Sequence, residues 1–190
     1  NNDDQVYLGF SIIGKKKNYV KSKRIKKGNL YITGKIGSAL VFAAIEKKII
    51  SGMYSEEVIN TMKQSNYEIF KIFNKFSIQH ITDISGFGLA IHANNLLLRS
   101  SDLNGLEISL KKVPLYKGAI EALNNNVKSS LNDANKNSII NNLRVDYDKI
   151  NKKHLNCLFD PQTAGGFLFI LDTTQKKILD ELDKKKINYS

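Results

Sequence analysis

The sequence is poor in cysteine and proline and contains no tryptophan. Its one cysteine, Cys157, permits no disulfide within the chain and no metal site built from several cysteines. A chain without internal disulfides suits a reducing compartment, so we expect a cytoplasmic protein.

Long apolar runs are absent as well. No stretch approaches the ~20 consecutive apolar residues that a membrane-spanning helix needs, and residues 1–4 lack the basic and apolar regions of a secretory signal. We therefore expect no membrane partner. The sequence also lacks a Walker-type phosphate loop, a nucleophile elbow and histidines at metal-ligand spacing, which excludes several familiar catalytic sites.

Arginine is scarce although the chain is strongly basic. The formal net charge is +11, yet only Arg24, Arg99 and Arg144 are arginines. Arginine is the favoured side chain for bidentate contacts to phosphates and to guanine. The densest basic cluster, 15–27, surrounds an expected hairpin, where lysines keep an edge strand from pairing with another chain. We therefore expect a solvated basic surface and no nucleic-acid partner.

The sequence contains enough apolar residues for one folded domain over residues 1–190. Hydrophobic residues make up 42% of the chain, which favours a globular core over disorder. Alternating apolar residues predict strands, and apolar residues three and four apart predict helices. The expected strands cover 6–13, 19–25, 30–33, 79–81, 106–110 and 167–171. The expected helices are one capped by Ser38 and ended by Gly52, a longer one capped by Ser55 and reaching Phe73, then 89–97, 119–123 and one starting at Thr173, with a polar loop or short helix over 124–142.

Strands and helices alternate along the chain, with hairpins mixed in. This order predicts an α/β fold, layered in the α+β manner, with a mixed β-sheet flanked by helices.

The most informative stretch is 82–88, Thr-Asp-Ile-Ser-Gly-Phe-Gly. It follows a short apolar run and opens into a helical pattern, so it predicts a strand, a tight glycine turn and a helix start. A carboxylate at the end of such a strand lies beside free backbone N–H groups, where anions and their metal ions collect. Asp83 holds that position; its alternative role is that of a turn or cap carboxylate. Gly86 and Gly88 are expected to let the backbone turn.

A second stretch, 160–166, repeats this arrangement near the other end of the chain. It reads Asp-Pro-Gln-Thr-Ala-Gly-Gly, an acidic residue and a proline-set turn followed by paired glycines that lead into the strand 167–171. Asp160 and Thr163 either brace this turn or line a site. Each stretch alone is a weak signal, but the two in this order are specific.

Two other reactive side chains have structural interpretations. His92, on the helix after the first glycine turn, fits a histidine that pairs with the backbone. Cys157 fits a small buried hydrophobic residue better than a nucleophile.

Together the two stretches resemble the C-terminal domain of selenophosphate synthetase (selenide, water dikinase). The first stretch continues into Leu89 and then His92-Ala93, with the second stretch downstream. Residues 5–14 are similar to the family's domain-entry strand, and 28–37 to its Gly-Asp-x-Leu segment. The family belongs to the aminoimidazole ribonucleotide synthetase superfamily, whose members handle ATP. The resemblance therefore implies the fold of that superfamily's C-terminal domain.

The resemblance implies an enzyme that converts ATP, selenide and water to selenophosphate, AMP and phosphate with Mg²⁺. It implies magnesium binding by Asp83. The residues implied to help form the ATP site are Thr82, Ser85, Gly86, Gly88, Asp160 and Thr163.

The family's reactive cysteine or selenocysteine, its catalytic lysine, its glycine-rich loop and most of its metal-binding aspartates lie in an N-terminal half without a counterpart here. We therefore expect no catalytic residue in these 190 residues, little turnover by them alone, and a longer chain that supplies the N-terminal domain in cis. The implied partners are ATP and selenide as substrates and a second copy of the full-length chain in a homodimer.

Several positions depart from the family's pattern. Asn29 replaces an aspartate, Gly34-Lys35 replaces Lys-Pro, Ser85 replaces threonine and Ala164 replaces serine. These differences leave two alternatives open. One is another ATP-dependent kinase or synthetase of the same superfamily, and the other is a binding or scaffold domain that keeps the fold without the chemistry.

Overall fold

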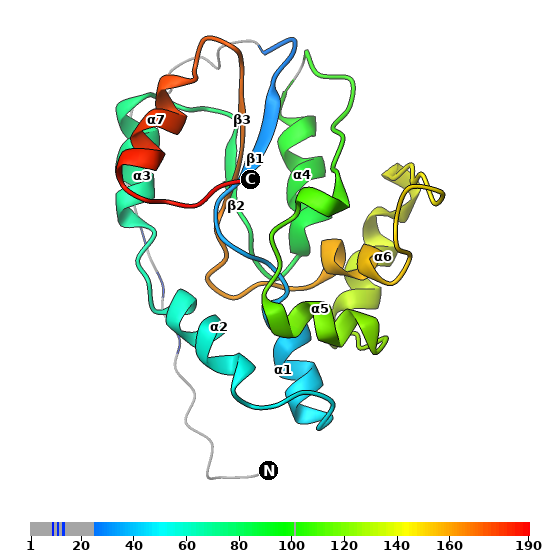
Figure 1. Ribbon diagram of the computed structural model, residues 1–190. Helices are drawn as coiled ribbons and strands as arrows, with labels where there is room; N and C mark the ends of the chain where they lie inside the picture. Colours follow the sequence, from blue (N-terminus) through cyan, green and yellow to red (C-terminus); the bar gives the residue numbers. More distant parts are fainter. Residues whose placement is uncertain (1–8, 10, 12, 14–24, 101) are drawn as a thin grey trace.

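The computed structural model describes residues 9, 11, 13, 25–100 and 102–190. In this part of the chain, helices surround a small sheet (Figure 1). In chain order the elements are β1 (Asn29–Ile32), α1 (Ser38–Glu46), α2 (Tyr54–Met62), α3 (Tyr67–Lys75), β2 (Ile81–Asp83), α4 (Gly88–Leu98), η1 (Leu110–Lys112), α5 (Lys117–Asn124), α6 (Asn132–Ile139), η2 (Ile140–Asn142), η3 (His154–Phe159), β3 (Phe167–Leu171) and α7 (Lys177–Lys184), where η marks a 3-10 helix.

The sheet has the strand order β1-β3-β2, and β3 is antiparallel to both neighbours. Tyr31 of β1 and Ile81 of β2 both pair with Phe169, at the centre of β3. Because β1 and β2 run opposite to β3, the last residues of both outer strands lie at the same end of the sheet as the first residue of β3. A single parallel bridge, Ile36 with Leu115, lies outside these strands.

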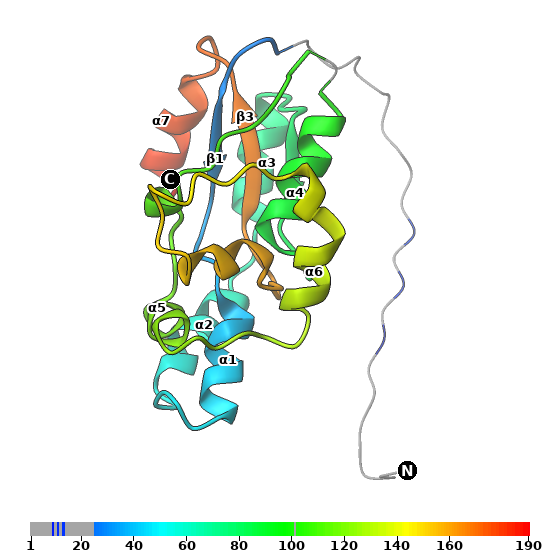
Figure 2. The same cartoon turned by 90° about the vertical axis from the view of Figure 1, so that its right-hand side faces the viewer.

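The central strand is apolar throughout because helices cover both faces of the sheet. Leu168 and Ile170 belong to one hydrophobic core, and Phe169 and Leu171 to a second. Successive side chains of a strand point to opposite faces, so a strand buried on both sides is apolar at every position. Figures 1 and 2 show α3 and α7 on one side of the sheet and α4 on the other.

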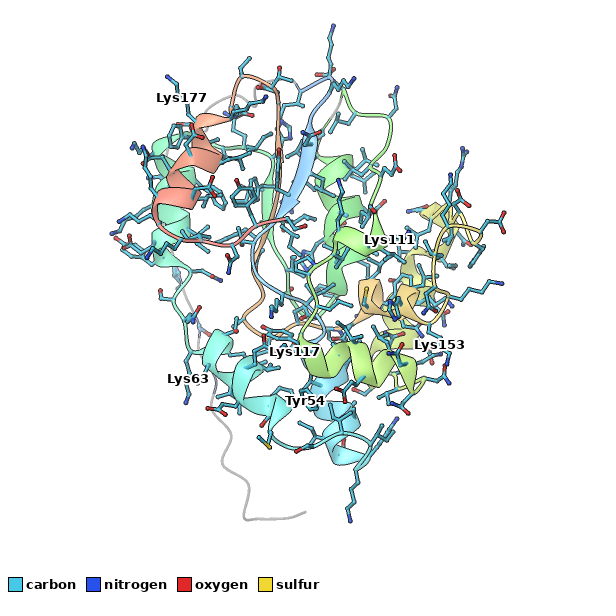
Figure 3. All side chains as sticks on the ribbon, viewed as in Figure 1. Tyr54, Lys63, Lys111, Lys117, Lys153 and Lys177 are labelled. Carbon is cyan, nitrogen blue, oxygen red and sulfur yellow. The ribbon has the colours of Figure 1, made fainter. Side chains whose placement is uncertain are left out.

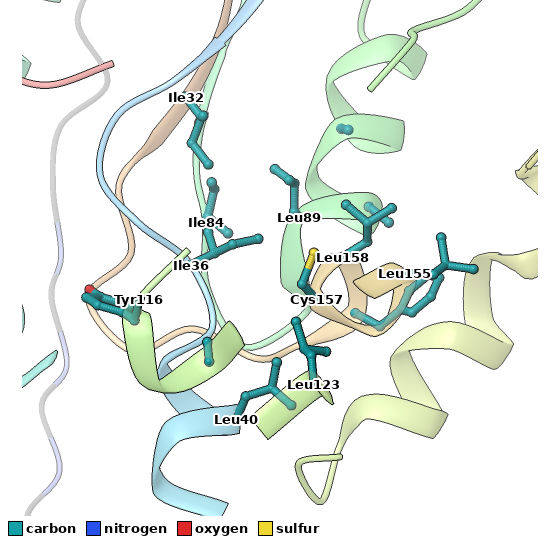
Figure 4. Packing of buried hydrophobic residues seen from close by; sticks show 14 of the residues in the cluster. Ile32, Ile36, Leu40, Ile84, Leu89, Tyr116, Leu123, Leu155, Cys157 and Leu158 are labelled. Carbon is teal, nitrogen blue, oxygen red and sulfur yellow. The ribbon is translucent and has the colours of Figure 1, made fainter. Parts of the chain in front are cut away.

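The larger core joins the sheet to the helices gathered at one end of the domain. Figure 4 shows Leu40 of α1, Leu89 of α4, Leu123 of α5 and Leu158 of η3 in the same cluster as Ile84, which directly follows β2, and all five are buried. The ends of β2 and β3 are therefore held in densely packed surroundings, which limits how far the turns next to them can move.

The predicted α/β fold with helices flanking a sheet is confirmed, but the three described strands form an antiparallel sheet and not the predicted mixed one. The strand 167–171 has the predicted limits, and the strand at 30–33 is observed as β1. The predicted strand 6–13 and most of the predicted strand 19–25 lie outside the described residues.

The strand predicted at 106–110 is wrong. The segment has no ladder partner among the described strands, and it ends in the 3-10 helix η1. Leu106 and Ile108 lie partly buried against the larger core, whereas Glu107 and Ser109 are exposed. The alternation thus comes from an extended segment lying on the core, without the hydrogen bonds of a sheet.

The single long helix predicted from Ser55 to Phe73 is also wrong, because the structure has two helices there. Val58 of α2 packs in the larger core, whereas Phe73 of α3 packs in the core on the other face of the sheet. One straight helix cannot pack against both cores, because they lie on opposite faces of the sheet. The chain breaks between them at Asn66, whose side chain donates a hydrogen bond to the Gly165 carbonyl at 3.1 Å.

The predicted first helix ends earlier than expected. α1 stops at Glu46 rather than continuing to Gly52, and Ile49 is exposed after it.

None of the described helices is long and apolar enough to cross a bilayer.

Candidate functional site

The two glycine-rich stretches, far apart in sequence, meet at one end of the sheet. The Ile84 N–H donates to the Gly166 carbonyl at 2.9 Å, and the Gln162 N–H donates to the Ser85 carbonyl at 3.1 Å. They meet because the first stretch follows β2, the second precedes β3, and these antiparallel strands are neighbours. The pairing of the two motifs is therefore a consequence of the strand order.

Glycine is required by close contact at some of these positions and not at others. Gly88 has φ +76°, and a Cβ atom there would lie 2.9 Å from the Leu158 carbonyl oxygen. At Gly165 a Cβ atom would lie 2.2 Å from the Ile84 carbonyl oxygen. At Gly86, by contrast, no atom lies within 4 Å of that position. The expectation that both glycines of the Gly-Phe-Gly turn serve its backbone geometry is supported for Gly88 only.

Asp83 is the last residue of β2 and is exposed. Within the described residues, its carboxylate makes no hydrogen bond or ion pair, while its backbone carbonyl accepts a 3.2 Å hydrogen bond from the Thr82 hydroxyl. An exposed carboxylate at the end of a strand, followed by an open glycine, is accessible to a cation.

The residues around Asp83 provide too few ligands for a complete metal site. Within the part of the chain that the structure describes, no three His, Cys, Asp or Glu side chains come close enough to hold a metal ion together. Magnesium is commonly held by one or two protein carboxylates, with waters and nucleotide phosphates completing its coordination. A metal ion held at Asp83 would therefore need ligands from outside the described residues, such as water or a bound anion.

His92 of α4 lies behind this turn and is 8% exposed. Its Nε2 atom accepts the Ser85 N–H at 3.1 Å and lies 3.0 Å from Ser85 Oγ, and its Nδ1 atom lies 3.4 Å from Thr82 Oγ1. Burial lowers the pKa of His92 below its ordinary value; the nearby Asp83 charge acts in the opposite direction, and Arg99 adds to the lowering. The predicted backbone-pairing histidine is thus observed.

Asp160 is buried completely, unlike Asp83. Its carboxylate accepts hydrogen bonds from Ser129 Oγ at 2.7 Å, from Gln162 Nε2 at 3.0 Å and from the Leu40 N–H at 3.3 Å. Burial raises the pKa of Asp160 to about 6, and these hydrogen bonds only partly oppose that rise. Of the two roles left open for Asp160, these contacts support bracing of the turn.

Thr163 lies at the exposed tip of the same turn. Its backbone N–H donates a long hydrogen bond of 3.5 Å to Ser38 Oγ, and within the described residues its hydroxyl makes no hydrogen bond. Thr163 is therefore accessible to a ligand, as is the half-exposed Ser85 hydroxyl in the other turn.

Ser38 does not cap α1, contrary to its predicted role. Gly37 holds the cap position, with φ 101°, and the start of the helix is satisfied by Gln162 instead. The Gln162 Oε1 atom accepts hydrogen bonds from the Gly37 N–H at 3.1 Å, the Ser38 N–H at 3.2 Å and Ser38 Oγ at 3.1 Å. A side chain 124 positions away supplies the cap, and helix-capping rules applied to local sequence cannot find it.

Asn135 of α6 was not among the predicted site residues, yet it contacts the first glycine turn. Its side-chain amide donates to the Gly86 carbonyl and to the Phe159 carbonyl, both at 2.9 Å. This residue therefore joins the first glycine turn to the segment leading into the second. The sequence pattern does not distinguish Asn135 as a site residue, because it is one of many asparagines in a polar stretch with weak helical patterning.

Cys157 lies inside the larger core and is 1% exposed (Figure 4). Burial raises the pKa of its thiol to about 12, and the neighbouring Asp160 charge adds to the effect. A thiol with this pKa carries almost no thiolate at neutral pH, so the geometry does not support a nucleophile.

We expect the Cys157 thiol of the native protein to react with a disulfide reagent at pH 8 at least roughly 1,000-fold more slowly than a free thiol, because reaction requires opening of the core. Absorbance of the released thiolate measures the rate. The same protein in denaturant, reacting fully and at once, is the control. Fast labelling without denaturant would contradict the buried placement.

The basic residues of the described part are distributed over several elements. Figure 3 labels Lys63 after α2, Lys111 in η1, Lys117 in α5, Lys153 before η3 and Lys177 in α7. Lysines on separate elements are typical of a solvated surface. The absence of a nucleic-acid partner stays a prediction.

These features define an α/β domain in which a small antiparallel sheet presents an exposed aspartate between two interlocked glycine turns. No family model matches the chain. The chain is homologous to selenide, water dikinases over most of its length.

Three such relatives illustrate the similarity. The chain is 29% identical over 155 residues to the selenide, water dikinase of Clostridioides difficile, an alignment that covers 82% of this chain and 43% of that protein. It is 26% identical over 182 residues to that of Treponema denticola, covering 94% and 50%. It is 26% identical over 190 residues to that of Aliarcobacter butzleri, covering 98% and 54%. The chain therefore spans about half the length of the curated relatives it matches.

Proposed function

We propose that this chain is the domain that completes the magnesium–ATP site of an enzyme forming selenophosphate, AMP and phosphate from ATP, selenide and water. The contact between the two glycine turns beside the exposed Asp83 carboxylate carries the proposal. The homology to selenide, water dikinases supports the choice of reaction.

In this proposal Asp83 provides one oxygen ligand, and the rest of the enzyme provides the nucleophile and most of the nucleotide pocket. A bound magnesium ion neutralises the phosphate charge that develops during transfer. Gly86 leaves space for the phosphates to approach the backbone, since neither its φ angle nor its packing requires glycine. The hydroxyls of Thr82, Ser85 and Thr163 are the candidate polar contacts of the magnesium–nucleotide complex, including its bound waters.

Asp160 supports this site indirectly. Its buried carboxylate holds Ser129, Gln162 and the start of α1 together, and so fixes the second turn against the first. Asp160 and Gly88 therefore act on the ATP site through the shape of the turns. A homodimer of the full-length protein and a cytoplasmic location belong to the same proposal.

The reaction is tested with the native gene product, ATP and Mg²⁺, with and without selenide, by phosphorus NMR of the products. Selenide-dependent formation of AMP and selenophosphate would establish the proposal. Nucleotide turnover with a different phosphate acceptor would support another kinase or synthetase of the superfamily, which the departures at Asn29 and 34–35 leave open. No nucleotide turnover and no magnesium-dependent nucleotide binding would favour a scaffold domain.

We expect Asp83→Asn in the native protein to lower kcat/KM for ATP by about 100-fold or more, because an amide oxygen is a weaker magnesium ligand than a carboxylate. Steady-state kinetics at several magnesium concentrations measure the loss. Asp146→Asn is the matched control, since Asp146 is an exposed carboxylate paired with Lys149 away from the turns. Equal activity of the Asp83 variant and the wild type would remove the metal role.

A further inference from the structure

His92 contacts the chain on both sides of Asp83. On one side its Nδ1 atom lies 3.4 Å from Thr82 Oγ1; on the other its Nε2 atom receives the Ser85 N–H at 3.1 Å. The Thr82 hydroxyl also lies 3.2 Å from the Asp83 carbonyl oxygen. One imidazole thus brackets the residue proposed to bind magnesium.

These contacts fix the tautomer of His92. A backbone N–H can only donate, so Nε2 must be the unprotonated nitrogen. The proton of the neutral ring is then on Nδ1 and is directed to Thr82 Oγ1, which in turn donates to the Asp83 carbonyl oxygen. Because Nε2 carries no proton, the Ser85 hydroxyl shares the one lone pair of Nε2 with the Ser85 N–H, and among the described residues no donor is directed at Ser85 Oγ, which leaves its lone pairs to a ligand.

The surroundings of His92 make this arrangement rigid. His92 is buried, on a helix whose Leu89, Ala93 and Leu96 are all in the larger core. The ring centroid of the exposed Phe87 lies 6.3 Å from that of His92. Because the core holds the His92 side chain in place, its hydrogen bonds restrain the backbone of the exposed turn.

We propose that His92 is a positioning residue for the magnesium-binding turn, which fixes the backbone before and after Asp83 and thereby orients its carboxylate. This inference rests on the proposed magnesium role of Asp83. In this role His92 supports the site without contacting metal or nucleotide. The Ser85 hydroxyl, which donates to His92, is then an acceptor toward ligands, and an acceptor suits a magnesium-bound water rather than a phosphate oxygen.

The geometry is tested first, in the native protein, by long-range nitrogen NMR of the histidine rings. The expected result is a neutral His92 ring with its proton on Nδ1. A ring with its proton on Nε2 would overturn the proposal, since that nitrogen could no longer accept the Ser85 N–H.

The functional part is tested in the native protein by calorimetric titration of Mg²⁺ in the presence of a non-hydrolysable ATP analogue. His92→Leu removes both ring nitrogens and is expected to raise the magnesium Kd about 10-fold or more, as loss of supporting hydrogen bonds does at other metal sites. His92→Gln keeps an acceptor at the reach of Nε2 and is expected to restore most of the affinity. An unchanged Kd in His92→Leu would overturn the proposal.

Leu96→Ala on the same helix is the matched control for stability. It removes buried apolar contacts of α4 without touching the turn, so it should lower the unfolding midpoint and leave the magnesium Kd unchanged. If Leu96→Ala weakened magnesium binding as much as His92→Leu, helix stability alone would explain the effect, and the positioning role would be lost.

A double variant separates this proposal from the one it rests on. If His92 acts through Asp83, adding His92→Leu to Asp83→Asn should weaken magnesium binding no further. Asp83→Asn with an unchanged Kd would instead refute the magnesium role of Asp83. If Asp83→Asn weakened magnesium binding while His92→Leu left the magnesium Kd unchanged, only the role of His92 would be refuted.

Discussion

Replacing Gly166 with alanine is expected to lower the free energy of unfolding by about 4 kcal/mol or more, a loss that few single substitutions cause. The added Cβ atom would lie 1.7 Å from the Thr33 carbonyl oxygen and 2.6 Å from its carbonyl carbon. Thr33 cannot move aside, because its N–H donates to the Phe167 carbonyl at 2.9 Å and its Oγ1 accepts the Phe167 N–H at 2.8 Å. Urea unfolding followed by circular dichroism measures the change.

Gly86→Ala is the matched control, in the neighbouring turn. Its Cβ atom would meet nothing within 4 Å, and the residue does not have a positive φ, so its free energy of unfolding should stay within about 1 kcal/mol of the wild type. Similar unfolding free energies for the two variants would contradict the close contact between β1 and the second glycine turn.

Asp160→Asn is expected to become more stable relative to the wild type as the pH rises. Burial raises the pKa of Asp160 to about 6 from an ordinary value of 3.8, so the folded protein resists ionising this group. A raised folded-state pKa gives stability that is present below pH 4 and is lost as the pH rises through 6. Because one pKa unit corresponds to 1.36 kcal/mol, and part of the change occurs below pH 4, the difference between the two proteins should change by about 2 kcal/mol between pH 4 and 7.

Asparagine can keep the hydrogen bonds of Asp160. Its Oδ1 atom can accept from the Leu40 N–H and from Gln162 Nε2, and its amide can donate to Ser129 Oγ, which rotates to accept. Urea unfolding at several pH values measures the difference. Asp160→Ala is the contrasting variant, since it leaves those buried donors unpaired and should be destabilised at every pH. A pH-independent difference between Asp160→Asn and wild type would contradict the raised pKa.

Patterns that depend on neighbours in sequence were predicted well. Strand 167–171 has its predicted limits because a strand buried on both faces is a continuous apolar run, bounded here by glycines and Asp172. The strand–turn–helix around Asp83 was predicted because the change of period from strand to helix occurs within a few residues.

Patterns with two physical explanations were predicted less well. The alternation over 106–110 fits a strand and also an extended segment on the core, and only the absence of a ladder partner among the described strands decides between them. The apolar residues from Ser55 to Phe73 fit one helix, but Val58 and Phe73 belong to cores on opposite faces of the sheet.

The sequence by itself determined the α/β class and both glycine turns, and it singled out Asp83 and Asp160 as candidate site residues. Tertiary structure alone decided that the two aspartates differ, with Asp83 exposed and Asp160 buried among three donors. It also decided that Gln162 caps α1 and that His92 brackets Asp83. The physical reason is that the burial and the hydrogen-bond partners of a side chain depend on residues that the strand order brings close in space. The local sequence does not show which distant residues these are.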